Sequence, residues 1–330
     1  IPDVLRRLHL LGPHDADPPM TALEGGVSSD IWRVDLPTGP VCVKRARPRL
    51  RVDAVWEAPT RRSDYEAAYL REVAPIAPGH VPRLLAHDTD EHVLVLSWLD
   101  PATHTLWRTE LLEGRVDAQT AEMVGRILVA VHATTAADAT IQDRFDTLDL
   151  FEALRLEPYL DATARAHPDL AGALTARRND YLTHRSALVH GDVSPKNIMV
   201  GPIGPVLLDA ECATFGDPAF DLAFCLNHLL VKCAHRPSST SAYLDAVGRM
   251  AAAYITGVTW EPAEGLEARV AALVPALALA RVDGKSPVDY LDERARGRLR
   301  EIARGLVAEP PSKLGELAAA WSSAWSRAWR

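Results

Sequence analysis

Hydrophobic and polar positions alternate along the first hundred residues in the way that strands require. Residues 31–36, 41–44 and 92–96 are short runs that are either rich in β-forming side chains or alternate apolar with polar positions, so each predicts a strand. Between the second and third runs, apolar residues recur at three- and four-residue spacings over residues 62–74, which predicts one helix. The first part of the chain is therefore expected to form a small sheet with a single helix.

The pattern changes after residue 98, where helical spacing becomes dominant. Four stretches predict helices, at residues 119–135, 219–231, 241–255 and 266–282. The exception is residues 187–209, where two short apolar runs flank a loop that contains Gly, Pro and Asn. Tryptophan recurs every fourth residue from Trp321 to Trp329, which predicts one face of a C-terminal helix.

Composition restricts the class of protein without naming its chemistry. The 330 residues are 48% apolar and 24% charged, which is typical of a folded globular protein. A formal net charge of -8 argues against a nucleic-acid binder, whose affinity comes largely from Lys and Arg. The longest apolar stretch, residues 270–280, is shorter than the about 20 residues of a membrane span. Four cysteines without disulfide or metal spacing, and no export signal near the start, predict a reduced cytoplasmic protein.

The strongest chemical signal lies in residues 190–197, with the sequence HGDVSPKN, and in the sequence VLLDAE that follows. A loop and a short hairpin would bring the side chains of Asp192, Asn197 and Asp209 to one pocket. Phosphoryl transfer needs such a group, because a carboxylate must orient the attacking hydroxyl and oxygen ligands must hold Mg²⁺ on the phosphates. The spacing therefore predicts a phosphoryl-transfer site.

These two motifs resemble the catalytic loop and the metal-binding aspartate of the aminoglycoside phosphotransferase and choline kinase-like family of small-molecule kinases. The resemblance spans about residues 23–223, and its strongest motifs lie in residues 189–223. It implies that Asp192 is the catalytic base and that Asn197 and Asp209 bind Mg²⁺.

The same resemblance implies an α+β fold with the two lobes of a protein kinase. Residues 1–99 would form a nucleotide-binding lobe of antiparallel sheet with one helix, and residues 100–330 a mostly helical catalytic and substrate-binding lobe. Lys44, at the end of a strand, would hold the α- and β-phosphates of ATP. Glu66 is the preferred ion-pair partner for this lysine, and Glu72 is the rival.

Two further segments complete the nucleotide site that the resemblance implies. A turn that contains Gly25, Gly26 and Ser28 would cover the phosphates, because glycine permits close backbone approach. The turn is not a GxGxxG motif, and an ordinary hairpin is the alternative. Backbone groups near Ser97 and Leu99 would bind adenine at a hinge between the lobes.

Other residues near the motifs are expected to have supporting roles. We expect His190 to support the loop through hydrogen bonds, Asp221 to bind the loop backbone and Asp217 to cap a helix. The charged segment 281–287 interrupts a helical region, so it is either a substrate loop or a solvated turn, and turn chemistry favours the second. The role of Glu211 is open.

The sequence leaves the acceptor open. Candidates are an aminoglycoside, another antibiotic, or a metabolite such as choline, methylthioribose or an amino-sugar alcohol, with ATP or GTP as donor. A protein substrate is less favoured, because Asp209-Ala210-Glu211 replaces the DFG motif of protein kinases. The rival from another class is a nucleotide-binding pseudokinase or regulatory module. We expect a monomer or homodimer that acts on a small hydroxyl compound and binds neither nucleic acid nor membrane.

Overall fold

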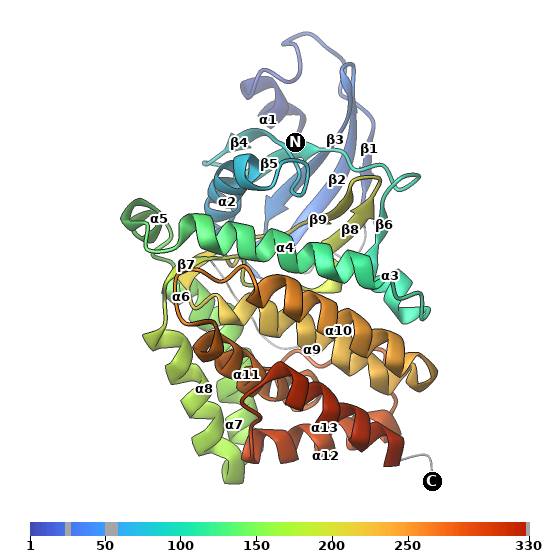
Figure 1. Cartoon of the computed structure of the whole chain (residues 1–330). Helices are drawn as coiled ribbons and strands as arrows, with labels where there is room; N and C mark the ends of the chain where they lie inside the picture. Colours follow the sequence, from blue (N-terminus) through green and yellow to red (C-terminus); the bar gives the residue numbers. More distant parts are fainter. Residues whose placement is uncertain (24–27, 50–58, 328–330) are drawn as a thin grey trace.

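The computed structural model of the chain describes residues 1–23, 28–49 and 59–327. Strands gather in the N-terminal part, and a larger body of helices follows (Figure 1). Five strands form an antiparallel sheet in the order β1-β2-β3-β5-β4. The strands are β1 Met20–Ala22, β2 Ser29–Leu36, β3 Gly39–Ala46, β4 Leu84–Asp88 and β5 Val93–Ser97.

Each face of this sheet buries its apolar side chains against a helix. Two clusters of buried apolar side chains lie on opposite faces of the sheet. In β5, Val93 and Val95 pack in the cluster with residues of α1 (Pro2–Arg7), whereas Leu94 packs in the cluster with residues of α2 (Arg62–Ile76). A strand whose successive side chains point to opposite faces can serve both clusters at once. The apolar run 92–96 therefore predicts a strand that is buried on both sides.

The three predicted strands and the predicted helix are confirmed, with bounds that differ by a few residues. The periodicity of the sequence did not predict β1 or β4. Both are edge strands of the sheet, where only one side is paired and the apolar pattern is weaker. The helix α2 runs two residues beyond the predicted end and includes Pro75.

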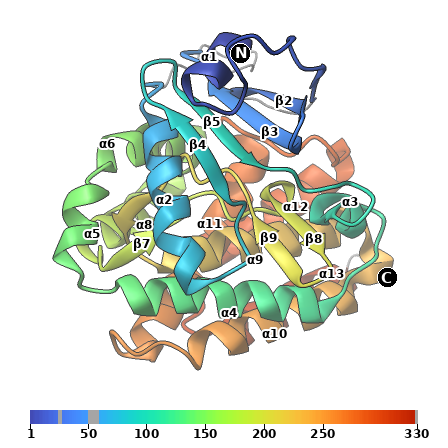
Figure 2. The same ribbon diagram turned by 90° about the horizontal axis from the view of Figure 1, so that it is seen from above.

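The rest of the chain is mostly helical, as predicted. The longer helices are α4 Ala118–Thr135, α8 Ala171–Thr183, α9 Ala219–His235, α10 Thr240–Ile255, α11 Ala263–Asp283, α12 Glu293–Ala308 and α13 Leu314–Arg327. Helix α9 lies at the centre, and its residues from Ala219 to Ala234 are all buried. A helix that is apolar on all sides belongs in the core. Helices α4 and α10 pack along each other below the sheet (Figure 2).

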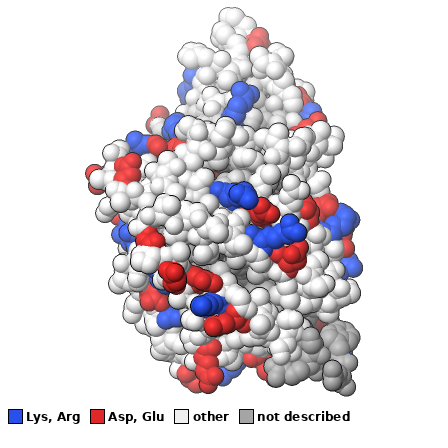
Figure 3. All heavy atoms as spheres, in the orientation of Figure 1, with Lys and Arg blue, Asp and Glu red and all other residues white. Residues whose placement is uncertain are grey.

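Buried aromatic and thiol side chains agree with the expectations from sequence. Trp321 and Trp325 are buried on one face of α13, whereas Trp329 lies outside the described residues. All four cysteines are free, and Cys42 alone among them is partly exposed. No helix within the described ranges is both long and apolar enough to cross a membrane. On one face, basic and acidic side chains are interspersed (Figure 3).

Short strands between the sheet and the helices carry the motif residues. Strand β7 (Ala187–Val189) pairs with β10 (Thr214–Gly216), and β8 (Ile198–Gly201) forms a hairpin with β9 (Gly204–Leu207). The loop from β7 to β8 contains HGDVSPKN, so the predicted loop and hairpin are both present.

Gly191 occupies a position in this loop that only glycine fits. Its φ is 78°, in the left-handed region. A Cβ atom at this position would lie 2.8 Å from the carbonyl oxygen of Cys212, which is closer than real contacts allow. The loop can therefore turn sharply after β7 only because the residue lacks a side chain.

Alanine at this position is expected to destabilise the fold. Gly191→Ala should lower the free energy of unfolding by about 2 kcal/mol or more, since left-handed backbone alone costs about 1–2 kcal/mol for other residues. Gly172→Ala in α8 is the matched control, because its added Cβ meets no atom within 4 Å. The free energy of unfolding of the control variant should rise by a few tenths to about 1 kcal/mol, because alanine favours a helix more than glycine does. Urea unfolding of both variants checks this, and equal effects would contradict the explanation.

Candidate active site

The loop after β7 is held by a carboxylate from the first turn of α9. Asp221 is fully buried, and its two oxygens accept hydrogen bonds from the backbone N–H groups of His190, at 2.7 Å, and Gly191, at 2.8 Å. The imidazole of His132 lies 3.3 Å from the same carboxylate. The predicted role of Asp221, binding the loop backbone, is confirmed.

The imidazole of His190 supports the loop from inside. The side chain is buried, and its Nδ1 lies 3.2 Å from the backbone nitrogen of Asp192. Burial lowers the pKa of His190, which favours the neutral ring that can accept this N–H. The edge of the ring packs against Tyr69 of α2, with centroids 5.1 Å apart. This agrees with the supporting role expected from the sequence.

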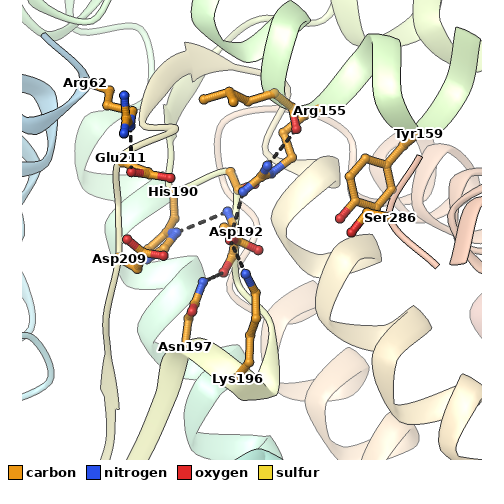
Figure 4. Close-up of polar contacts among 12 residues, drawn as sticks. Arg62, Arg155, Tyr159, His190, Asp192, Lys196, Asn197, Asp209, Glu211 and Ser286 are labelled. Carbon is orange, nitrogen blue, oxygen red and sulfur yellow. Dashed lines mark hydrogen bonds and ion pairs between the residues drawn. The ribbon is translucent and has the colours of Figure 1, made fainter. Parts of the chain in front are cut away.

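Asp192 lies between two cations. Its Oδ2 is 2.8 Å from Nη2 of Arg155 and 3.3 Å from Nζ of Lys196. Arg155 also donates from Nε to the carbonyl of Gly191 (Figure 4). Burying a carboxylate is costly unless it is paired, and these two cations offset that cost. Asp192 is thus held in one orientation.

Sequence reasoning did not identify either of these cations. Arg155 lies in a π-helical segment, Glu152–Asp161, and Pro158 within that segment has no N–H to donate. Such segments are rare overall, but those that occur are often at functional sites. The proline inside a helical pattern was therefore the one feature of the sequence that could have pointed to this segment. Lys196 was visible four positions after Asp192 in the motif itself.

Asn197 and Asp209 are brought together by the β8–β9 hairpin. The backbone N–H of Leu208 donates to the carbonyl of Asn197 at 2.8 Å, which places Asp209 beside the loop. Asn197 donates from Nδ2 to the carbonyl of Asp192 at 3.1 Å. Asp209 has a left-handed φ of 67°, a strained conformation for this residue type that recurs at functional sites. Asp192, Asn197 and Asp209 therefore lie in one site (Figure 4).

Lys44 of β3 connects this site to the sheet. Its Nζ lies 2.6 Å from Oε2 of Glu66 and also contacts Asp209. Burial works against the charge of Lys44, but the carboxylates of Asp209 and Glu66 outweigh it and raise the pKa of the ammonium. Burial alone would raise the pKa of Asp209, yet Lys44 and Lys196 lower it. The preferred partner Glu66 is confirmed, whereas Glu72 contacts Arg144 instead.

Glu211 has a buried arginine as its partner. Arg62, at the start of α2, is fully buried, and its Nε lies 3.0 Å from Oε2 of Glu211. The same guanidinium donates to the backbone carbonyls of Ser28 and Arg47. Glu211 thus ties the segment after β9 to the strands of the sheet, a role that its sequence position did not reveal.

The other predicted nucleotide-binding residues lie along the sheet. Gly25 and Gly26 lie outside the described residues. Ser28 is buried before β2, and Ser97 ends β5, where its backbone N–H donates to the carbonyl of Arg83. Leu99 is half-buried in the connection that leaves the sheet. Their contacts with a nucleotide, and the division at residue 99, stay predictions.

The donor atoms of the site suit a hard divalent cation. Asp209 offers carboxylate oxygens, and the Oδ1 atom of Asn197 accepts no hydrogen bond from the described residues. Within the described part of the chain, no three His, Cys, Asp or Glu side chains form a cluster that would hold a metal alone. Mg²⁺ typically takes one or two protein carboxylates and completes its shell with phosphates and water. These residues fit that mode of binding.

Comparison with known proteins identifies relatives that match on sequence. Curated methylthioribose kinases from Yersinia pseudotuberculosis and Pectobacterium atrosepticum are each 26% identical over 235 residues, which is 63% of this chain. The alignments cover 57% and 58% of those two proteins, so the chain spans less than two thirds of their length.

Solved structures share the fold at low identity. An amicoumacin kinase in complex with AMP-PNP, Ca²⁺ and Ami has a TM-score of 0.56 and 13% identity, with 96% of each chain covered. A choline/ethanolamine kinase family protein from Mesorhizobium loti has a TM-score of 0.50 and 19% identity, covering 97% of this chain and 98% of that one. The predicted protein-kinase-like α+β fold is confirmed.

The family comparison matches the part of the chain that holds the sheet, the loop and the hairpin. A family model described as the phosphotransferase enzyme family covers residues 19–236, which is more than half of the chain. The match includes Lys44, Asp192 and Asp209. The chain therefore belongs to the phosphotransferase enzyme family, as the resemblance of its loop motif predicted.

Proposed function

We propose that the protein is a kinase that transfers the γ-phosphate of Mg²⁺-bound ATP to a hydroxyl group of a small molecule. The observation that carries the proposal is the meeting of Asp192, Asn197 and Asp209 with the Lys44–Glu66 pair at one site. Phosphoryl transfer needs a hydroxyl-orienting carboxylate, metal ligands and a lysine for the phosphates, and this site has a residue for each task. Membership in the phosphotransferase family supports the same conclusion.

The sheet would hold the nucleotide. In this assignment residues 1–99 form the nucleotide-binding lobe, with adenine beside Ser97 and Leu99 and the phosphates beside Lys44. Lys44 is already buried and paired with Glu66, so its ammonium is positioned before any ligand arrives. Asp209 and Asn197 would hold the cation, which offsets negative charge on the phosphates when bound. Asp209 would then exchange part of its contact with Lys44 for the cation.

Asp192 would orient the acceptor hydroxyl and take its proton. Arg155 and Lys196 hold this carboxylate in place through ion pairs, and a carboxylate can accept that proton. Asp221 fixes the loop backbone, so little reorganisation is needed when the acceptor binds. The positive charge of Lys196 also lies where it would stabilise charge on the transferring group.

A turnover screen tests the proposal directly. The protein is incubated with Mg²⁺ and ATP and with pooled hydroxyl compounds, and products are sought at a mass gain of about 80 Da, one phosphoryl group. Asp192→Asn should slow any transfer by about 100-fold or more, because general base catalysis typically contributes about 10²–10⁴. The matched control is Asp245→Asn on the exposed side of α10, which should not change the rate. Unchanged transfer in Asp192→Asn would refute the assignment.

Nucleotide binding gives a second test. Lys44→Met should weaken binding of a non-hydrolysable ATP analogue about tenfold or more, because a charged hydrogen bond to phosphate is lost. Arg45→Met on the same strand is the control, since Arg45 is exposed and pairs with Glu91. Calorimetric titration of both variants checks this. Binding of ATP without transfer to any acceptor would favour the regulatory module over the kinase.

A further inference from the structure

The segment that follows α11 lies beside the candidate active site and not in open solvent. Arg281, in the last turn of α11, donates from Nη1 to the hydroxyls of Tyr159 and Ser286, each at 3.0 Å. Tyr159 shares the π-helical segment with Arg155, which holds Asp192. Figure 4 shows Tyr159 and Ser286 together on the side of Asp192 that faces away from Asp209. The segment therefore forms a wall beside Tyr159, although Lys285 and Pro287 remain exposed as the turn prediction expected.

One face of α9 continues this wall. Phe224 packs under Arg155, whose guanidinium lies 5.7 Å from the ring centroid. One turn later, His228 lies 5.3 Å from the Phe224 ring, and Lys232 follows after another turn. The Nζ of Lys232 lies 5.4 Å from the ring of Tyr290, in the segment after α11. Side chains of α9 thus lead from the catalytic loop to this segment.

Three cations gather at the end of this path. Arg108 of α3 (Trp107–Leu112) lies 5.9 Å from the Tyr290 ring, near Lys232, and Arg281 completes the group. We call Arg108, Lys232 and Arg281 the basic cluster. The imidazole of His228 is affected both by these charges and by Lys196 of the loop. Burial lowers the pKa of His228 well below its usual value, and the charges of the basic cluster and of Lys196 lower it further.

The basic cluster has few carboxylates to balance it. Arg108 pairs with Asp289 at 2.7 Å, and Asp289 is largely exposed. The contacts described for Arg281 are with neutral hydroxyls, and the hydrogen bond described for Lys232 is to the carbonyl of His228 at 3.2 Å. Burial lowers the pKa of Lys232 to about 7, and the nearby Arg108 and Arg281 act in the same direction. Within the described residues, positive charge is therefore in excess here.

A buried lysine without a carboxylate partner is costly, whether it keeps its charge or gives it up, and a chain usually avoids it unless the group has a use. Lys232 is 1% exposed, although most of the other residues of α9 are apolar. Spare donors lie around it. The Nε of Arg281 and the hydroxyl of Tyr290 are buried with no hydrogen-bond partner in the described structure. These groups are arranged to receive a negatively charged acceptor.

We propose that the acceptor is an anion, a hydroxyl compound whose carboxylate or phosphate group binds Arg281, Lys232 and Arg108 while its hydroxyl meets Asp192. This inference rests on the proposed kinase function of the same site. In the transfer step, the bond between the γ-phosphorus and the bridging oxygen of ATP breaks, and a bond from that phosphorus to the acceptor oxygen forms. The acceptor proton passes to Asp192, and ADP leaves. A cationic acceptor such as choline or an aminoglycoside would meet like charges.

Binding of matched ligands tests the charge preference without any turnover. The protein is saturated with Mg²⁺ and a non-hydrolysable ATP analogue, so that anions cannot occupy the phosphate site. Glycerate, glycerol phosphate, neutral glycerol and cationic serinol are then titrated by calorimetry. At least one anion should bind about tenfold or more tightly than glycerol, since hydrogen bonds to charged groups are the stronger kind. The better anion distinguishes a carboxylate site from a phosphate site.

Two variants connect this preference to the basic cluster. Arg281→Gln and Lys232→Met should each reduce the preference for the anion about tenfold, the loss expected for one charged contact. Lys232→Met should also leave Tm unchanged or raise it, because it replaces an uncompensated buried charge with an apolar chain. A lysine with only a structural role would instead lose stability on this change. Lys285→Gln is the control, since Lys285 lies in the same segment but pairs with Glu157 at 2.7 Å.

The outcomes separate this inference from the kinase proposal. Equal or stronger binding of glycerol or serinol, no saturable binding of either anion, or a preference that survives both variants would overturn the anionic acceptor. Transfer of phosphate to a cationic compound, unaffected by Arg281→Gln, would also overturn it and leave the kinase intact. A preference for anions with no transfer to any acceptor would remove the kinase function and retain the anion site.

Discussion

The rest of the site depends on the ion pairs that the ammonium group of Lys44 makes. This group joins strand β3 to α2 through Glu66 and to the turn after β9 through Asp209. These three elements are far apart in the sequence, and each contributes a charge that would be costly to bury alone. Removal of Lys44 would leave the two carboxylates buried without their cation. The relative position of the sheet and the hairpin is therefore set by electrostatics as well as by apolar packing.

Helix α9 organises the other half of the site. Its first turn places Asp221 under the loop backbone, where a carboxylate near a helix N-terminus is favourable. Its later turns place His228 and Lys232 beside the segment after α11. Because nearly the whole helix is buried, these side chains have little freedom to move. One core helix thus positions both the loop that would perform the chemistry and the basic cluster that would select the acceptor.

The family model covers the part of the chain that would perform transfer. It covers only some of the residues that would select the acceptor. The match ends at residue 236, so it includes Asp192, Asp209 and Lys232 but not Arg281. Relatives and structural neighbours are named for methylthioribose, amicoumacin and choline or ethanolamine. A shared fold does not fix the acceptor, so selection must come from the particular residues of each site. In the proposed assignment, the positively charged basic cluster would make that selection in this chain.

The sequence by itself determined the local features of this protein: strands and helices from the periodicity of apolar residues, and the loop motif whose geometry follows from Gly191 and its neighbours. The resemblance to the family also favoured Glu66 over Glu72, because the stretch that begins at Glu66 resembles the family's helix. Only the tertiary structure decided that Arg155 pairs with Asp192, that Arg62 pairs with Glu211, and that Arg108 and Lys232 meet at the ring of Tyr290. The physical reason is the distance along the chain over which each kind of interaction acts. Periodicity reports the burial of neighbouring residues, whereas a charge finds its partner through contacts between segments that the fold alone brings together.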